Sequence, residues 1–259
     1  MSTAITYLII QAIVLWLASL WLKDSSLFDR FWALSFVVIA WLLKDEVLMS
    51  ISAEVYFAML NFWGLRLSWH ITRRNWGRGE DRRYADMRKR IPGYSWKSLG
   101  MIFGFQSAMV FVVALPLFSV FHFGISAHPI FQILGCSIWL LGLGVEILAD
   151  RQLKQFKARA HQPEQILDTG LWSISRHPNY VGEAILWWGL AIFAFTPQTW
   201  WVLISPIVMT WLLRYFTGVG PLEEDMLARK PLYAKYREQV PVFWPKKIYA
   251  TASSQKPSV

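Results

Sequence analysis

Long apolar runs, separated by short charged segments, recur along most of this chain. They cover residues 3–22, 31–43, 53–71, 100–120, 129–148, 180–195 and 200–217. A helix needs about 20 apolar residues to cross the hydrocarbon core of a bilayer, and the longer runs meet that length. Because lipid offers no hydrogen-bond partners, only helices and closed barrels can span it. The sequence therefore predicts an all-α fold, a polytopic membrane helix bundle of about seven transmembrane helices.

The composition agrees with a chain immersed in lipid. Of its 259 residues, 55% are hydrophobic and 16% aromatic, including 16 Trp, which is far above the average of soluble proteins. The net charge of +9 falls between the apolar runs, so it indicates cytoplasmic loops beside membrane lipids rather than nucleic-acid binding. The single cysteine, Cys136, excludes an internal disulfide and offers no metal-binding pattern.

The basic segments also predict an orientation. They follow the third, fifth and seventh runs, at residues 72–97, 150–175 and 220–247. Odd-numbered span ends share one side of a membrane, and cytoplasmic loops carry the excess of Lys and Arg. We therefore expect the N-terminus outside and the C-terminus in the cytoplasm. Residues 1–249 are expected to form one transmembrane domain, and residues 250–259 a disordered tail.

One stretch, residues 168–183 (DTGLWSISRHPNYVGE), concentrates polar groups at the start of an apolar run. Its proline can open a helix, which places Asn179 and Glu183 on one face, four residues apart. Arg176 and His177 precede that helix, where backbone N–H groups point outward. Such a cradle suits a phosphate or carboxylate, although an anchor for lipid headgroups has the same appearance.

Acidic and basic residues at the end of the fifth run suit a nucleotide cofactor. Glu146 and Asp150 lie four residues apart and offer acceptors for ribose hydroxyls, while Lys157 and Arg176 offer cations for phosphates. The alternative is a solvated helix end with charge pairs. The sequence contains no glycine-rich phosphate loop. The half of the chain at residues 130–247 carries these motifs.

Ionisable residues within the third run are the candidates for proton transfer. Arg66 and His70 lie four residues apart, and intramembrane ionisable groups are costly enough to suggest a function. His70 can exchange a proton near neutral pH, although a histidine at the headgroup boundary is an equal alternative. Tyr84, in the basic segment, and Gln106, in the fourth run, are further candidates.

The motif GLW, followed by SRHPNYxGE up to Glu183, resembles the signature of the steroid 5-alpha-reductase C-terminal superfamily. It is most similar to the bacterial membrane-protein branch of unknown function in that superfamily, which implies a location in the bacterial inner membrane. The resemblance continues through residues 66–87, Gln106, and residues 146–156 and 231–245. RHP with a tyrosine also occurs in isoprenylcysteine carboxyl methyltransferases, which share the architecture but bind S-adenosylmethionine.

The resemblance implies an NADPH-dependent reduction of a carbon–carbon double bond conjugated to a carbonyl, in a steroid-like or isoprenoid lipid. Asn179 and Glu183 fall where the reductases place polar cofactor contacts, Asp150 at an acidic ribose-side position, and Lys157 at a phosphate-facing cation. The expected cofactor-binding residues are Glu146, Asp150, Lys157, Arg176, His177, Asn179, Tyr180, Glu183, Tyr233 and Tyr236. As proton donor we expect His70 first and Tyr84 second, with Gln106 as an orienting partner, and no metal.

Two departures from the reductase pattern leave alternatives open. The Gln-Glu pair that the animal enzymes carry in an early span is absent, and so is their His/Tyr set before the C-terminus. Leu222-Glu223-Glu224, followed by Tyr233 and Tyr236, is similar to the methyltransferase pattern. One alternative is therefore an S-adenosylmethionine-dependent methyltransferase of a lipid or isoprenylcysteine. Another is a non-catalytic lipid- or sterol-binding membrane protein.

Overall fold

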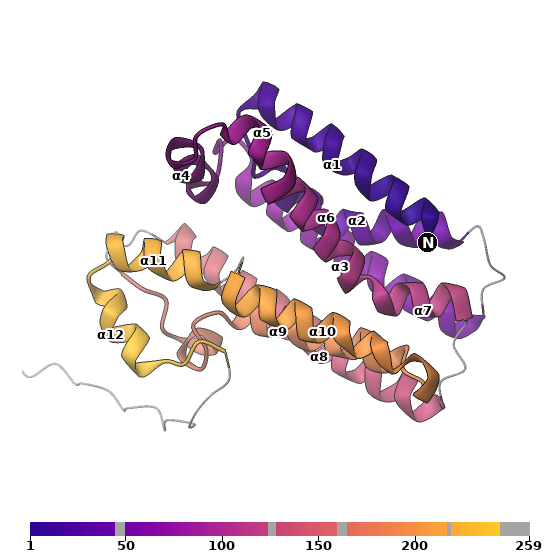
Figure 1. Cartoon of the computed structure of the whole chain (residues 1–259). Helices are drawn as coiled ribbons and strands as arrows, with labels where there is room; N and C mark the ends of the chain where they lie inside the picture. The colour runs from indigo at the N-terminus through magenta and orange to yellow at the C-terminus, as the bar shows by residue number, and fades with distance from the viewer. Residues whose placement is uncertain (45–49, 124–127, 160–164, 217–218, 244–259) are drawn as a thin grey trace, which may run out of the picture. The chain divides into compact units, whose positions relative to one another are not determined.

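The computed structural model describes residues 1–44, 50–123, 128–159, 165–216 and 219–243, and within these ranges all regular structure is helical (Figure 1). The predicted all-α class is thus confirmed. Three helical stretches are long and apolar enough to cross a membrane: Ser2–Leu22, Tyr94–Val113 and Pro129–Ala158. The seven-span count and the side of each terminus stay predictions, and the tail at residues 250–259 lies outside the described ranges.

The chain forms two compact units. Unit one comprises Met1–Leu140 and Leu186–Thr210, and unit two comprises Leu141–Ile185 and Trp211–Val259. The long helix α8 (Pro129–Ala158) and helix α9 (Pro178–Phe193) contribute residues to both units. The expected single domain over residues 1–249 stays a prediction.

Unit one begins with three helices: α1 (Ser2–Leu22), α2 (Leu27–Lys44) and α3 (Ile51–Asn75). They cover the first three expected spans. The helices α2 and α3 approach closely at Gly64, where a Cβ atom would lie 3.0 Å from the Ala33 carbonyl oxygen. Small residues permit such approaches between membrane helices.

The basic segment and the fourth apolar run follow in unit one. They form α4 (Arg82–Arg90), α5 (Tyr94–Ser98), a π-helical stretch η1 (Leu99–Gly104), α6 (Phe105–Val113) and α7 (Leu115–Phe123). The helix breaks at Ala114, two residues before Pro116, because a proline ring crowds the backbone that precedes it.

The fifth run continues further as a helix than its apolar part predicts. We expected the span to end at Leu148, whereas α8 reaches Ala158 and so carries Asp150 and Lys157 on its last turns. Pro178 opens α9, as predicted. The turn after α9 is closed by Thr196 and Thr199, whose side chains and backbone N–H groups bond reciprocally.

The remaining elements are short. They are the 3₁₀ turns η2 (Gly170–Ser173) and η3 (Pro197–Leu203), the helix α10 (Ile204–Trp211), the π-helical stretch η4 (Leu212–Phe216), and the helices α11 (Val219–Arg229) and α12 (Leu232–Gln239). Together η3, α10 and η4 take the place of the seventh expected span.

Glycines bring α8 and α9 into backbone contact. In unit two, a Cβ atom on Gly182 would lie 2.5 Å from the backbone nitrogen of Glu146 and 2.7 Å from the carbonyl oxygen of Gly142. In unit one, a Cβ atom on Gly189 would lie 2.7 Å from the carbonyl oxygen of Gly135. No side chain fits at these distances, so glycine allows the two helices to touch.

Candidate functional site

Arg176 holds the start of α9 to the C-terminal helices of unit two. Its guanidinium donates to both carboxylate oxygens of Glu223, from Nε at 2.7 Å and from Nη2 at 3.0 Å. Its Nη1 donates to the backbone carbonyls of Arg237 and Val240. Paired hydrogen bonds of this kind between charged groups are strong and fix orientation. Arg176 is 6% exposed, so we call it, with Glu223, the buried anchor.

His177 completes this arrangement. Its Nε2 lies 3.1 Å from Glu223 Oε1, and its ring stacks on Tyr180, with the centroids 5.7 Å apart. Burial disfavours the charged form of the imidazole, and this lowers the pKa of His177. The imidazole is therefore neutral at pH 7 and donates from Nε2 to the carboxylate.

The carboxyl group of Glu223 is held in its charged form. Burial alone would raise its pKa, but the hydrogen bonds from His177 and Arg176 and the charge of Arg176 outweigh burial and lower the pKa to about 2. The buried anchor is therefore an ion pair over the whole physiological pH range.

Acid is expected to destabilise the fold in two steps. The neutral form of His177 is favoured by folding, so stability falls once the pH drops below about 6.5, where an unfolded histidine takes up a proton. The low pKa of Glu223 adds stability that is complete above about pH 4.5 and is lost as the pH falls towards about 2. Melting temperatures of the purified protein between pH 7.5 and 3 measure this effect.

The comparison protein for that experiment is His177→Phe, which removes the first step and, because His177 also bonds Glu223, makes the second step smaller. Its melting temperature should be flat between pH 7.5 and 5.5, where the wild type declines. A wild-type melting temperature that is constant down to pH 4 contradicts the prediction.

The anchor changes the expected role of three residues. Four donor directions of Arg176 already meet protein acceptors, which favours a structural role over the phosphate contact expected from the sequence. The Tyr236 hydroxyl donates to the Trp172 carbonyl at 2.6 Å, and Tyr233 packs against the Tyr236 ring at 5.7 Å. These tyrosines hold the 3₁₀ turn before the motif in place.

A second polar group in unit two lies where α8 and α9 touch. We call it the polar seam, and it consists of Glu146, Asp150, Asn179 and Glu183. Asn179 Nδ2 donates to Asp150 Oδ1 at 3.4 Å. Glu146 is 2% exposed, Glu183 7% and Asp150 9%. The structure thus brings together the acceptors that the sequence assigned to a cofactor, while Lys157 is exposed on the last turn of α8.

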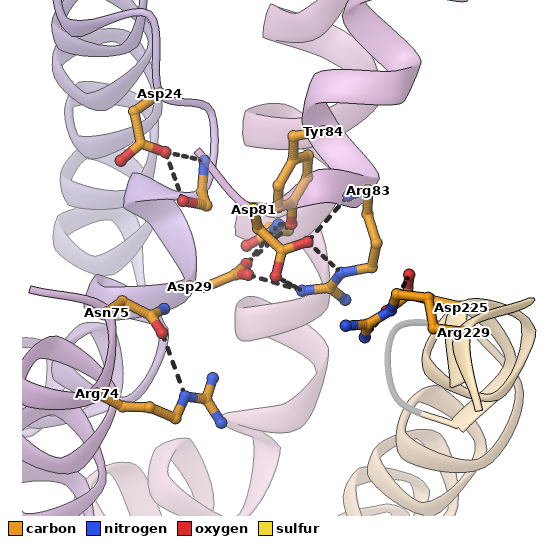
Figure 2. A network of polar contacts seen from close by, with 11 residues as sticks. Asp24, Asp29, Arg74, Asn75, Asp81, Arg83, Tyr84, Asp225 and Arg229 are labelled. Carbon is orange, nitrogen blue, oxygen red and sulfur yellow. Dashed lines mark hydrogen bonds and ion pairs between the residues drawn. The ribbon is translucent and has the colours of Figure 1, made fainter. Parts of the chain in front are cut away.

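A third polar network lies in unit one and contains two of the proposed catalytic residues, Tyr84, which Figure 2 labels, and Gln106. The Tyr84 hydroxyl donates to Asp29 Oδ1 at 2.9 Å, and Gln106 Nε2 donates to the Tyr84 hydroxyl at 3.0 Å. Arg83 Nη2 donates to Asp29 Oδ2 at 3.2 Å. Tyr84 and Gln106 therefore meet, with Asp29 as the residue that the sequence analysis did not identify.

The basic segment is docked on the turn between α1 and α2. The Glu80 carboxylate accepts hydrogen bonds from the Ser25 backbone at 2.8 Å and from Arg88 at 2.7 Å. Asp81 caps α4 by accepting from the Arg83 backbone. These contacts place Tyr84 inside unit one, where burial raises its pKa well above 10 and keeps its hydroxyl protonated.

The signal for Asp29 was present but easily overlooked. It is a carboxylate two residues before an apolar run, and a charged group at that boundary is costly unless it has partners. His70 lies on α3 and is half-buried, one turn beyond Arg66. Its role stays a prediction.

The fold and the motifs together define a helical protein with membrane-compatible helices and a polar site around the RHPN segment. Residues 15–240 match a family described as "Protein of unknown function (DUF1295)", and the chain belongs to this family. It is also similar to the "Uncharacterized protein C594.04c" of Schizosaccharomyces pombe. The two are 25% identical over 269 residues, which covers 90% of this chain and 76% of the relative. No solved structure matches the chain significantly.

Proposed function

We propose that this protein is a membrane reductase that uses NADPH to reduce a carbon–carbon double bond conjugated to a carbonyl, in a steroid-like or isoprenoid lipid. The observation that carries the proposal is the polar seam, where Asp150 and Asn179 meet one helical turn from the buried Glu146 and Glu183. Buried acceptors of this kind suit the ribose hydroxyls and amide of a nucleotide. The resemblance of the motif to the steroid 5-alpha-reductase superfamily supports the same reading.

The cofactor residues divide by their surroundings. The polar seam would hold the uncharged parts of NADPH. Because Arg176 is paired with Glu223, the phosphates would instead be bound by exposed cations at the end of α8, namely Arg151, Lys154 and Lys157. NADPH supplies the hydride when it is bound.

We expect Asn179→Ala and Glu183→Ala each to weaken NADPH binding by about 1–3 kcal/mol, because one removes a half-buried amide and the other a buried carboxylate that would bond the cofactor. Titration calorimetry on the purified protein measures the affinity. Gln198→Ala serves as the control, because Gln198 is an exposed residue in the turn after α9 and its loss should leave the affinity unchanged. Equal affinities in all four proteins would exclude the polar seam as the cofactor site.

Reduction of an enone also needs an acid near the carbonyl oxygen, where negative charge develops. The network of unit one favours Tyr84, since its hydroxyl is buried, protonated and oriented by Asp29 and Gln106. We expect Tyr84→Phe to reduce turnover on the order of 10²-fold or more with NADPH affinity intact. His70→Phe tests the first choice from the sequence in the same assay, and Tyr215→Phe, at an exposed tyrosine, is the control.

Each outcome of that assay assigns the donor. Loss of turnover in Tyr84→Phe alone supports Tyr84, and loss in His70→Phe alone transfers the role to His70. Unchanged turnover in both variants removes both residues from the mechanism.

One observation favours a second candidate, an S-adenosylmethionine-dependent methyltransferase. The polar seam carries three carboxyl groups, and Arg176, a buried cation of the same unit, is already neutralised by Glu223. A sulfonium cofactor is positively charged and suits such surroundings. Calorimetry with S-adenosylmethionine beside NADPH separates the two enzymes, and binding of neither supports a non-catalytic lipid-binding protein.

A further inference from the structure

Two tryptophans of unit one bury their indole N–H groups. Trp63 of α3 is 0% exposed and Trp187 of α9 is 1% exposed. Within the part of the chain that the structure describes, neither Nε1 atom has a hydrogen-bond partner. Buried polar side-chain groups in native proteins are in their large majority hydrogen-bonded, so two adjacent exceptions require an explanation.

The two indoles cannot satisfy each other. Their ring centroids lie 5.1 Å apart and their planes are 86° apart, so the edge of one ring meets the face of the other. In this arrangement one N–H at most can point at the partner's ring face, which is a weak acceptor. An indole has a donor and no acceptor. At least one N–H group therefore needs an acceptor from outside the pair.

The surroundings of the pair are aromatic. The ring centroid of Phe36, on α2, lies 4.9 Å from that of Trp187 and 5.8 Å from that of Trp63. The Tyr56 hydroxyl and the Trp139 indole, also in unit one, are two more buried donors without a partner among the described residues. Unit one thus contains several buried hydrogen-bond donors that lack acceptors among the described residues. Lipid around these segments would supply no acceptor either.

We propose that Trp63, Trp187 and Phe36 form a binding site for the carbonyl oxygen of an apolar molecule, a ketone or a quinone. A carbonyl oxygen accepts two hydrogen bonds, and an uncharged, flat, apolar molecule can enter an aromatic environment without the cost of burying a charge. The proposal concerns binding alone, so it stands or falls separately from the reduction proposed above.

The test uses progesterone, a polycyclic ketone, and ubiquinone-1, a quinone, with the full-length protein in detergent micelles. Equilibrium binding is measured for the wild type, Trp63→Phe and Trp187→Phe, which keep an aromatic ring but lose the N–H group. Trp200→Phe is the control, because Trp200 is an exposed tryptophan of the same unit. Pregnane, the hydrocarbon skeleton of progesterone, tests the need for oxygen as a competitor.

We expect saturable binding of at least one probe by the wild type, about tenfold weaker in Trp63→Phe or Trp187→Phe, and unchanged in Trp200→Phe, as the loss of a buried hydrogen bond predicts. Pregnane should not compete. In ¹⁵N-labelled wild type, the indole proton of Trp63 or Trp187 should move downfield when the ketone or quinone is added, a readout that needs no variant to fold. The proposal is overturned if neither probe binds, if both variants keep wild-type affinity, or if the indole protons do not move.

Discussion

Glu223→Ala is expected to lower the free energy of unfolding by about 3–5 kcal/mol, the largest effect we predict for a single substitution. Glu223 accepts two hydrogen bonds from Arg176 and one from His177. Its removal leaves the guanidinium buried, at 6% exposure, without the carboxylate that neutralises its charge. Removing one partner of a buried ion pair costs this much because the remaining charge keeps its desolvation penalty.

The neighbouring Glu224→Ala is the matched control, because Glu224 lies on the same helix and is exposed. The melting temperature should drop by roughly 6–20 °C in Glu223→Ala and stay near wild type in Glu224→Ala. The double variant Arg176→Met/Glu223→Leu removes both charges and should recover much of the loss. Equal melting temperatures for the two single variants would show that Arg176 does not depend on Glu223.

Gly182→Ala is expected to destabilise the protein by about 3 kcal/mol, at the upper end of what overpacking costs. The new Cβ atom would lie 2.5 Å from the backbone nitrogen and 2.9 Å from the Cα atom of Glu146, and 2.7 Å from the carbonyl oxygen of Gly142. A backbone cannot rotate away as a side chain does, so α8 and α9 must move apart. The contact between Asp150 and Asn179, at 3.4 Å, lies beside this crossing and should be lost.

Gly144→Ala separates this clash from the general effect of adding a methyl group. It lies on α8, two residues before Glu146, and its Cβ atom would meet nothing within 4 Å. Alanine is favoured over glycine in a helix by roughly 0.5–1 kcal/mol, so this variant should be as stable as wild type or slightly more stable. Similar melting temperatures for the two alanine variants would refute the close approach at Gly182.

The helices were predictable because the lengths of the apolar runs and the residues that begin or end a helix determine them. The runs at residues 3–22 and 180–195 reappear almost unchanged as α1 and α9, and Pro178 opens a helix as its ring geometry requires. The extension of α8 beyond Leu148 was not predicted, because hydrophobicity marks where lipid ends and not where a helix ends. Charged residues such as Asp150 and Lys157 continue a helix in water without difficulty.

The proximity of some candidate residues was predictable, whereas the hydrogen-bond partners of others were not. Asn179 and Asp150 were expected to serve one cofactor, and they lie in contact. Sequence spacing could not show that Arg176 pairs with Glu223, because the two are 47 residues apart and only folding brings them together. For the same reason Asp29, 55 residues from Tyr84, was not among the candidates.

The length of α8 has a consequence for the membrane that surrounds it. Its 30 residues extend about 45 Å at 1.5 Å per residue, whereas the hydrocarbon core measures about 30 Å. A helix of this length that crosses a bilayer would carry its last turns, with Asp150 and Lys157, beyond the hydrocarbon core by a distance that bilayer thickness determines. Acyl-chain length then becomes a control on where these side chains sit relative to the headgroups, since a mismatch is relieved by tilting or by deforming the lipid.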